Sequence, residues 1–232
     1  MRQQILRGFV IVVALTALFH AERTSAETVP FDLLIPNAAI NAYPAPFANV
    51  NINLTDATHA TVTFQSSITG GYQYLMGDGS TVALNVNTTS FTVGPVTESN
   101  SLGSPFIATW KATNLTSMNV DGLGPFNLTI DNKGGFQDSA TSVQFTLTNT
   151  SGSWANALAV LLPNSSGYQA AAHIFVCPDG SCNPSVGILA TGFAAGVVVV
   201  PVPAAFLLFG SGLLGLAGAQ WRRRQSSQSD MA

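Results

Sequence analysis

Two cysteines close a short turn near the end of the chain, and they carry its clearest chemistry. Cys177 and Cys182 flank the sequence Pro-Asp-Gly-Ser, which favours a tight turn that brings the two thiols together. In an oxidising compartment such a pair forms a disulfide. A metal site would require two further ligands, and the Cys-x4-Cys spacing differs from the Cys-x-x-Cys of redox enzymes. The pair therefore predicts a disulfide that clamps a local turn.

Residue types used in catalysis are present, but they form no recognisable motif. His173 lies among alanine, isoleucine and phenylalanine, which predicts a buried histidine with one hydrogen-bond partner. No Gly-x-Ser-x-Gly segment marks a nucleophile, and a glycosidase carboxylate pair is recognised only from a measured separation. The acidic segment 131–138 lacks the ligand spacing of a known calcium loop. We therefore predict no catalytic residue, no metal site and no cofactor, and we expect that the chain is not an enzyme.

Aromatic side chains could form a sugar-binding site, because flat rings present apolar surface to the C–H groups of sugars. The candidates are Tyr72, Tyr74, Trp110, Trp154 and Tyr168. Packing in a hydrophobic core would use the same residue types. A sugar-binding face and core packing are therefore both open.

The end of the chain indicates a location and not a reaction. A proline box, an apolar run and a basic cluster follow one another: Pro201, Val202, Pro203 and Ala204, then residues 204–221, then Arg222, Arg223 and Arg224. The run contains eighteen uncharged residues, and at about 1.5 Å of rise each they span about 27 Å, close to the thickness of a bilayer core. The arginines should remain on the cytoplasmic side. We therefore expect one membrane-spanning helix.

This block closely resembles the PEP-CTERM sorting signal of exported proteins of Gram-negative bacteria. Members of that family end in a Pro-Glu-Pro-like box, a glycine-rich apolar helix and a basic cluster, and here Gly210, Gly212 and Gly215 supply the glycines. Val202 stands where the family usually has glutamate, as in a Val-Pro-Leu-Pro-Ala variant of the signal. The resemblance implies recognition by an exosortase, a membrane enzyme that acts near the box, in organisms that make exopolysaccharide and biofilm. A plain tail anchor is the alternative.

The start of the chain predicts export. Arg2 and Arg7 precede the apolar stretch 9–19, and small residues that suit signal peptidase end at Ala26. We therefore expect cleavage after Ala26 and a mature chain that begins at Glu27. An uncleaved anchor is the alternative, although the stretch is short for one.

Charge is scarce between the two ends. From Glu27 to Pro201 the only basic residues are Lys111 and Lys133, against nine acidic residues. Nucleic acid is therefore excluded as a partner, because phosphate binding requires a basic surface. The low charge and the abundance of Thr, Ser, Asn and Gly are typical of an extracellular β-protein with a neutral, hydroxyl-rich surface. About 170 residues suffice for one domain with a substantial core.

Apolar and polar residues alternate through this central region, which predicts half-buried strands. The alternating apolar positions are Ala60, Val62 and Phe64; Val82, Leu84 and Val86; Phe91 and Val93; Phe106, Ala108 and Trp110; Phe126, Leu128 and Ile130; and Val143, Phe145 and Leu147. Turn sequences lie between them at 77–79, 121–122, 131–135 and 149–152. We therefore predict an all-β protein, an antiparallel β-sandwich that is jelly-roll-like, with a barrel as the alternative.

Two further stretches, 156–162 and 169–176, are apolar at nearly every position. Such runs predict central strands that are covered on both faces. The expected organisation is a signal peptide over 1–26, a secreted β-sandwich domain over 27–193, a linker over 194–200, the sorting signal over 201–224 and a cytoplasmic tail over 225–232.

Together these features predict an exported cell-surface or extracellular-matrix protein that an exosortase processes. We expect it to cross the inner membrane of a Gram-negative bacterium, to be anchored transiently by its C-terminal helix, and then to act structurally or adhesively in an exopolysaccharide and biofilm envelope. The expected partners are signal peptidase, the exosortase and exopolysaccharide. A lectin-like module that binds carbohydrate is the alternative function, and a hydrolase is a third.

Overall fold

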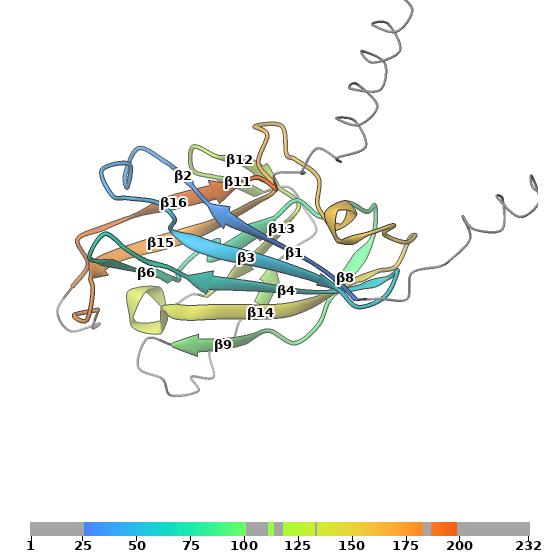
Figure 1. Cartoon of the computed structure of the whole chain (residues 1–232), viewed down its shortest axis with the longest axis horizontal. Coiled ribbons are helices and arrows are strands. Elements are labelled where there is room, and N and C mark those ends of the chain that lie inside the picture. The colour runs from blue at the N-terminus through green and yellow to red at the C-terminus, as the bar shows by residue number, and fades with distance from the viewer. Residues whose placement is uncertain (1–25, 101–110, 114–117, 133, 183–186, 199–232) are drawn as a thin grey trace, which may run out of the picture. The chain divides into compact units, whose positions relative to one another are not determined.

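The computed structural model describes residues 26–100, 111–113, 118–132, 134–182 and 187–198 (Figure 1). Residues 1–25 of the predicted signal peptide, the entire sorting signal over 201–224 and the tail over 225–232 lie outside the described residues, as do Phe106, Ala108 and Trp110. Within the part that is described, no helix is long and apolar enough to span a membrane. The predicted membrane helix therefore stays a prediction.

Strands dominate the described residues, interrupted by two single turns of 3-10 helix, η1 (Gly135–Asp138) and η2 (Ala157–Val160). Every pairing between described strands is antiparallel. Alternation of apolar and polar residues gives many of these strands one face for a core and one face for water, as is common in antiparallel sheets. The predicted all-β fold is confirmed.

One group of strands forms a layer that we call the first sheet. Its order is β1 (Glu27–Leu33), β3 (Ala48–Leu54), β4 (His59–Ser66) and β14 (Ala140–Asn149), and β8 (Phe91–Val93) and β9 (Thr97–Asn100) share the far edge of β14. Figure 1 shows β3, β4, β14 and β9 lying side by side.

The remaining strands form the second sheet, centred on β15 (Ala170–Pro178). One edge of β15 pairs with β16 (Ala190–Gly196), which in turn pairs with β2 (Ile35–Pro36). The other edge pairs with β6 (Tyr72–Met76) and β7 (Val82–Leu84), and beyond them lie β5 (Ile68–Thr69), β13 (Leu128–Asp131) and β10 (Lys111–Thr113). The central strand expected over 169–176 is therefore confirmed. A separate hairpin joins β11 (Met118–Val120) to β12 (Gly124–Phe126).

The two sheets meet at two corners. At one corner Ala140 of β14 pairs with Met76 of β6. At the other the chain passes directly from β1 to β2, and the Leu34 amide donates to the Ala195 carbonyl of β16 at 3.0 Å. The molecule is therefore sandwich-like, with two antiparallel layers connected through shared strands.

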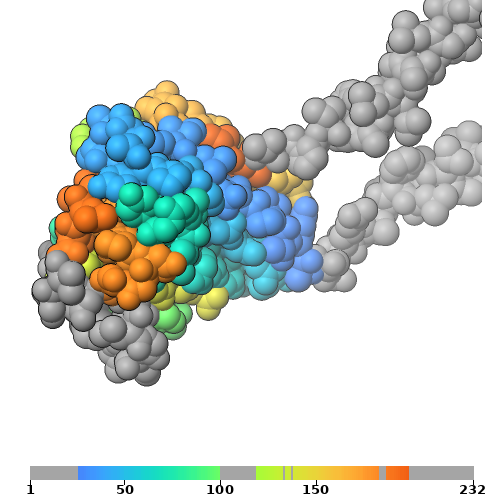
Figure 2. Space-filling view, turned by 60° about the vertical axis from the view of Figure 1, so that its left-hand side comes forward, coloured from blue at the N-terminus to red at the C-terminus, as the bar shows by residue number. Residues whose placement is uncertain are grey.

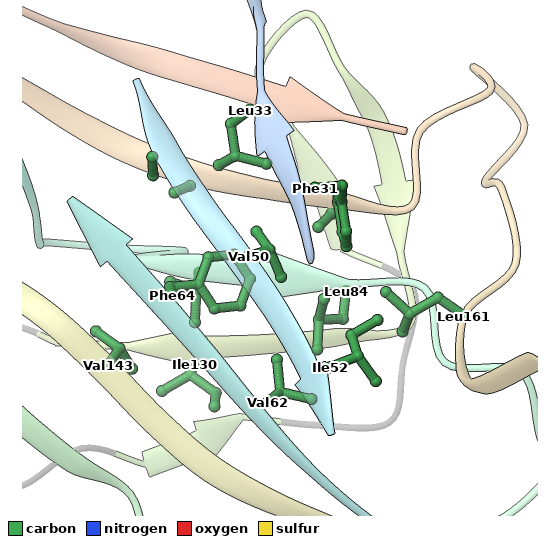
Figure 3. Close-up of a cluster of buried hydrophobic side chains, with 14 of the residues drawn as sticks. Phe31, Leu33, Val50, Ile52, Val62, Phe64, Leu84, Ile130, Val143 and Leu161 are labelled. Atoms are coloured by element: carbon green, nitrogen blue, oxygen red, sulfur yellow. The ribbon is translucent and has the colours of Figure 1, made fainter. Parts of the chain in front are cut away.

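The core lies between the two sheets and is built from their inward alternate residues (Figure 3). Val50 and Ile52 of β3 and Phe64 of β4 are completely buried, and they face Leu84 and Ile130 of the second sheet. Burial of each such side chain stabilises the fold by roughly 1.5–3 kcal/mol relative to exposure. The alternation predicted over 60–64 and 143–147 is confirmed, since all six of its apolar positions are buried.

Residues 156–162 do not form the predicted central strand. Asn156 instead caps η2, and its side-chain oxygen accepts a hydrogen bond from the Ala159 amide at 2.9 Å. This local bond competes with strand pairing. Ala157 and Val160 are buried against the core, which explains the run of apolar residues without a strand.

The domain also extends further than the sequence indicated. Residues 194–196 belong to β16, and the amide of the buried Val198 donates to the side-chain oxygen of Gln169. Residues 194–198, expected in a linker, are therefore part of the domain. Their small residues fit a tightly packed strand, since a side chain added at Gly196 would collide with the Asp32 carbonyl.

Candidate functional site

The outward side chains of the first sheet form aligned rows in which nearly all residues are polar and uncharged, the exceptions being Pro30 and Asp32 on β1. The middle row contains Pro30, Asn51, Thr63, Gln144 and Thr97, and it is flanked by a row of Thr28, Asn53, Thr61 and Thr146 and a row of Asp32, Asn49, Gln65, Ser142 and Ser99. We call these residues the polar face. Neighbouring strands are spaced about 4.8 Å apart, and successive outward residues of one strand about 7 Å apart, so the side chains form a regular array.

Some side chains of the polar face hydrogen-bond to one another. The Asn49 amide donates to the Asp32 carboxylate at 2.9 Å, the Thr28 hydroxyl donates to the Asn53 side-chain oxygen at 3.4 Å, and the Gln144 amide donates to the Thr63 hydroxyl at 2.9 Å. The Thr97 hydroxyl donates to the Gln144 carbonyl at 3.5 Å. On β3, β4 and β14, five side chains of the face have no hydrogen-bond partner within the described part of the chain: Asn51, Thr61, Gln65, Ser142 and Thr146. Their hydrogen-bonding groups are therefore left for water or for a ligand.

A histidine–aspartate pair lies in the turn between β3 and β4. One carboxylate oxygen of Asp56 accepts hydrogen bonds from the Thr58 amide at 2.7 Å and the His59 amide at 2.9 Å, and Nδ1 of His59 lies 2.9 Å from the same carboxylate. The Thr58 amide and the His59 side chain hold the pKa of Asp56 well below its ordinary range. The Thr58 hydroxyl donates to the same carboxylate at 2.9 Å and lies 3.0 Å from Nδ1 of His59. The carboxylate thus organises the turn by holding both neighbouring side chains.

His173 lies on the outward face of β15. Its Nε2 is 2.7 Å from the Thr191 hydroxyl, and its ring stacks on Phe193 with a centroid separation of 4.4 Å. Burial lowers its pKa, while the charge of Asp78 and the backbone of Gly77 act in the opposite direction. Nδ1 is buried and has no hydrogen-bond partner of normal geometry within the described residues. The predicted hydrogen-bond partner is present at Nε2, but the side chain is half-buried and not fully buried as predicted. A triad would also require a carboxylate bonded to Nδ1.

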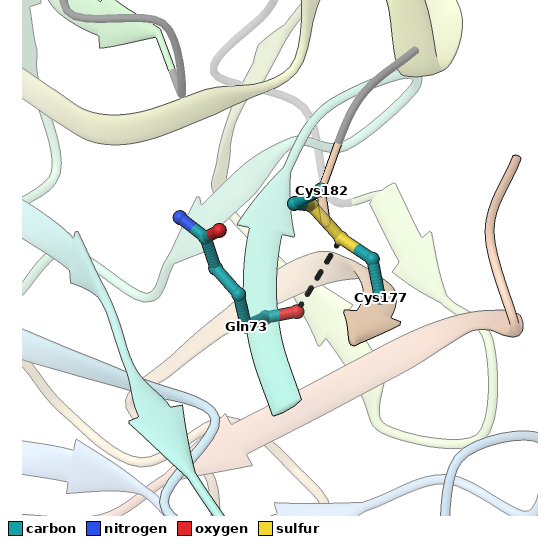
Figure 4. The surroundings of a disulfide bond; sticks show 3 residues. All are labelled: Gln73, Cys177 and Cys182. Carbon is teal, nitrogen blue, oxygen red and sulfur yellow. Dashed lines mark hydrogen bonds between the residues drawn. A yellow bond between two sulfur atoms is a disulfide. The ribbon is translucent and has the colours of Figure 1, made fainter. Parts of the chain in front are cut away.

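The predicted disulfide is confirmed, and it contributes to a cover over the second sheet. Cys177 at the end of β15 is bonded to Cys182, with 5.2 Å between their Cα atoms. Figure 4 shows the bond beside β6, where the Cys177 sulfur lies 3.6 Å from the Gln73 carbonyl. Together with Phe136 and Ile188, the two cysteines pack on Leu75 and Phe175.

The β11–β12 hairpin provides a second cover on the same sheet. Its apolar residues Val120, Leu123 and Phe126 are buried against three alanines of the sheet, namely Ala83, Ala171 and Ala195. The small alanine side chains allow the hairpin to approach closely. The outward residues of β15 are therefore apolar because they are covered, which is the physical reason for the uninterrupted apolar run at 169–176.

The aromatic residues considered for sugar binding do not form one exposed face. Tyr74 is buried, its hydroxyl donates to the Pro44 carbonyl at 2.6 Å, and burial raises its pKa to about 12. Trp154 is also buried, and its indole N–H donates to the Asn87 carbonyl at 2.9 Å. Tyr168 packs beside the hairpin. Core packing therefore explains these residues.

Tyr72 begins β6, where it pairs with Thr69 of β5. Figure 2 shows the β5–β6 turn (teal) between the segment 37–47 (blue) and the segment that follows β15 (orange). The ring of Tyr72 meets Tyr43 edge-on at 5.1 Å, and the Thr69 hydroxyl donates to the Pro46 carbonyl at 3.2 Å. These contacts fasten the turn to the rest of the domain.

The predicted processing sites fall mainly outside the described residues. This applies to Pro201, Val202, Pro203, Ala204, the three glycines of the apolar run and the three arginines that follow it. Ala26 is described and exposed, and Glu27 begins β1, where its carboxylate accepts a hydrogen bond from the Ala157 amide at 3.0 Å. Cleavage between Ala26 and Glu27 stays a prediction.

The described residues contain no group of three or more His, Cys, Asp or Glu side chains placed to hold a metal ion. Comparisons with protein-family models, with curated proteins and with solved structures give no match. The polar face is the feature that sequence reasoning did not locate. Asparagine at three alternate positions of one strand, Asn49, Asn51 and Asn53, is the signal that could have revealed it, because asparagine is depleted in strands.

Proposed function

We propose that this chain is an exported envelope protein of a Gram-negative bacterium that an exosortase processes at residues 201–224. The observation that carries the proposal is the ordered C-terminal block of Pro201-Val202-Pro203-Ala204, apolar run and arginine cluster. Signal peptidase removes residues 1–26, the tail anchors the chain in the inner membrane, and processing delivers the domain to the cell surface or the extracellular matrix. Its role there is structural or adhesive, within exopolysaccharide and biofilm.

The folded domain supports this proposal at both of its ends. Strand β1 begins at Glu27, so removal of the first 26 residues would leave every described strand intact. The last described contact of the domain is made by Val198, only three positions before Pro201. The proposed cleavage sites therefore flank the domain closely and do not interrupt it.

The disulfide of the domain is also consistent with export across the inner membrane. The Cys177–Cys182 disulfide belongs to an oxidising compartment such as the periplasm. We further assign the sandwich a jelly-roll-like topology, supported by a chain that passes from the first sheet in β1 to the second in β2 and back to the first in β3. Such a domain presents a surface and has no described catalytic group.

A carbohydrate-binding module is the second candidate function, and the polar face favours it. Asn, Gln, Thr and Ser side chains both donate and accept hydrogen bonds, as sugar hydroxyls do. The two candidates are compatible, because an adhesive matrix protein requires a ligand in the matrix.

Mass spectrometry of both termini tests the proposed processing. The exported protein should begin at Glu27 and lack the arginine cluster in cells that contain the exosortase, and it should retain the cluster in cells without it. Replacement of both Pro201 and Pro203 by Ala should block removal of the tail. Replacement of Arg222, Arg223 and Arg224 by Gln should impair membrane retention and processing.

Two results would contradict the proposal. A retained Met1 would show that the N-terminal stretch is an anchor. Equal retention of the tail in wild type, proline variant and exosortase-deficient cells would show that the C-terminal block is only an anchor.

A further inference from the structure

We propose that the polar face binds a neutral polysaccharide, whose chain lies flat across β3, β4 and β14. The inference rests on the proposed envelope function and adds the binding surface and the chemical class of its ligand. Three independent properties of the face support the proposal. Its residue types are unfavourable in strands, it carries almost no charge, and several of its side chains have no hydrogen-bond partner among the described residues.

The residue types on β3 are unfavourable for a strand. Asn49, Asn51 and Asn53 occupy its three central outward positions, although asparagine is depleted in strands relative to threonine or valine. Two of them have a structural partner, since Asn49 donates to Asp32 and Asn53 accepts from Thr28. Asn51, at the centre of the face, has no side-chain hydrogen bond among the described residues. Residues that break a local rule without a structural gain are typical of functional sites.

The face carries almost no charge. Soluble designs aim for surfaces with roughly 25–35% charged residues, whereas Asp32 on the marginal strand β1 is the only charged residue of the polar face. The domain has nine acidic residues against two lysines. An anionic polymer would therefore be repelled at long range and would find no cation on this face. A neutral polymer meets neither obstacle.

A protein partner is less suited to this face than a polysaccharide. Protein interfaces gather aromatic and large apolar residues at their centre. The exposed large apolar side chains of the described residues all lie elsewhere: Leu34, Ile35, Ile68, Leu162, Leu189 and Val197. The amide and hydroxyl groups of the face instead match ligand groups that donate and accept hydrogen bonds in turn.

The regular spacing explains why the ligand is a polymer and not a single sugar. One hydrogen bond contributes little net free energy of binding, because it replaces a hydrogen bond to water, so a single sugar on this face would bind weakly. Five side chains without partners, distributed over β3, β4 and β14, offer contacts to successive sugars of one chain. Once one contact holds the chain, the next forms at a high effective concentration.

Binding of the purified full-length protein in mild detergent to amorphous cellulose, dextran and galactomannan tests the inference, with alginate as the anionic comparison. Adsorption and affinity electrophoresis should show binding to at least one neutral polymer and at least tenfold weaker binding to alginate. The combined substitutions Asn51→Ala, Thr63→Ala and Gln144→Ala should weaken the neutral interaction at least tenfold. The substitutions Asn41→Ala, Asn119→Ala and Ser165→Ala, at exposed polar positions outside the face, should leave it unchanged.

Far-UV circular dichroism and thermal unfolding establish that both triple variants are folded. If the polar-face variant is not, the single variant Thr63→Arg takes its place, because a long side chain at the centre of the array prevents flat contact. Stronger binding to alginate, binding to none of the neutral polymers, or equal binding by the two triple variants would overturn the inference. So would a protein dimer, seen by sedimentation, that only the polar-face variant abolishes, since the face would then bind a second copy. These results do not depend on the terminal masses, so the processing proposal can fail or survive separately.

Discussion

The two outer faces of the sandwich have opposite designs. The outward side of the first sheet is polar, carries only Asp32 as a charged residue and is covered by no described segment, with Asn51, Thr63 and Gln144 at its centre. The outward side of the second sheet is apolar and covered, by the β11–β12 hairpin at one part and by the disulfide turn with η1 at another. Between the two covers lies His173, stacked on Phe193. The same strand geometry thus serves two purposes, one face adding stability and the other remaining available for contact.

The difference lies in the residues of each strand that point away from the main core. In β3 and β14 these outward residues are polar while the inward residues are buried, so the two types alternate along the strand. In β15 the inward residues join the main core, while the outward residues Ala171, Phe175 and Cys177 join two smaller clusters. A covered sheet face can therefore be recognised in the sequence of a strand, because the outward residues are apolar as well as the inward ones. An open face that carries neither charge nor apolar residues requires a different explanation, namely a ligand.

Removing the hairpin cover should have the largest effect on stability. Phe126→Ala deletes a completely buried ring that packs beside Ala171 and Ala195, and we expect the free energy of unfolding to fall by about 3 kcal/mol. Urea unfolding of the purified protein measures the change. Asn119→Ala, on the same hairpin but exposed, should change stability by less than about 0.5 kcal/mol. Equal effects of the two substitutions would show that the hairpin is not a cover.

Opening the disulfide should have the next largest effect. The bond closes a short loop, and the chain-entropy relation gives about 2 kcal/mol for a loop of this size. Replacement of both Cys177 and Cys182 by Ala should therefore lower the free energy of unfolding by about 2 kcal/mol, and reduction of the wild type should do the same. Before reduction, thiol reagents should not label the native protein. Labelled native thiols would contradict the assignment.

Acid should destabilise the covered face through His173. Burial lowers its pKa below the ordinary histidine value of 6.5, so the unfolded chain takes up a proton more readily than the folded one. The contribution of His173 is therefore complete above pH 6.5 and is lost as the pH falls from 6.5 to the lower folded-state value. We expect a smaller effect than for the two changes above, because Asp78 and the Gly77 backbone oppose burial.

Urea midpoints at pH 7.5 and pH 5.5 measure this dependence. The His173→Gln variant should lose most of the decrease in the urea midpoint that the wild type shows between these two pH values. Asp56 is a separate case, because its lowered pKa affects stability only below about pH 4. An unchanged pH dependence in His173→Gln would exclude its role.

The sequence was informative wherever one strand determines its own pattern. Alternation located the inward residues of β4 and β14, the Pro-Asp-Gly turn located the disulfide, and the apolar run located β15. Each of these signals is local, since it depends on the period of a strand or on the geometry of one turn.

Predictions failed where a distant or polar contact decides the structure. Asn127 interrupts the apparent strand 126–130, because its side chain bonds both the amide and the carbonyl of Val86, at 2.7 Å and 2.8 Å. Asn156 turns an apolar segment into η2 by capping it. The rows of the polar face require the pairing of β4 with β14, in which Thr63 lies opposite Gln144. Such a register between remote segments is not visible in the local pattern.

The substitution with the smallest expected effect on stability tests whether a residue of the polar face is retained for binding or for folding. Asn51→Thr replaces a residue that is unfavourable in strands by one that is favourable, and it removes no side-chain hydrogen bond within the described residues. We expect the free energy of unfolding to rise by about 0.5 kcal/mol or less, measured as a shift of the urea midpoint. Adsorption to the neutral polysaccharide should weaken in the same variant, since threonine lacks the reach and the second polar atom of the amide. A variant that gains stability and keeps full adsorption would show that Asn51 is not retained for binding. A variant that loses stability would show instead that Asn51 has a structural role, and the first sheet would then resemble the second in being shaped mainly by folding.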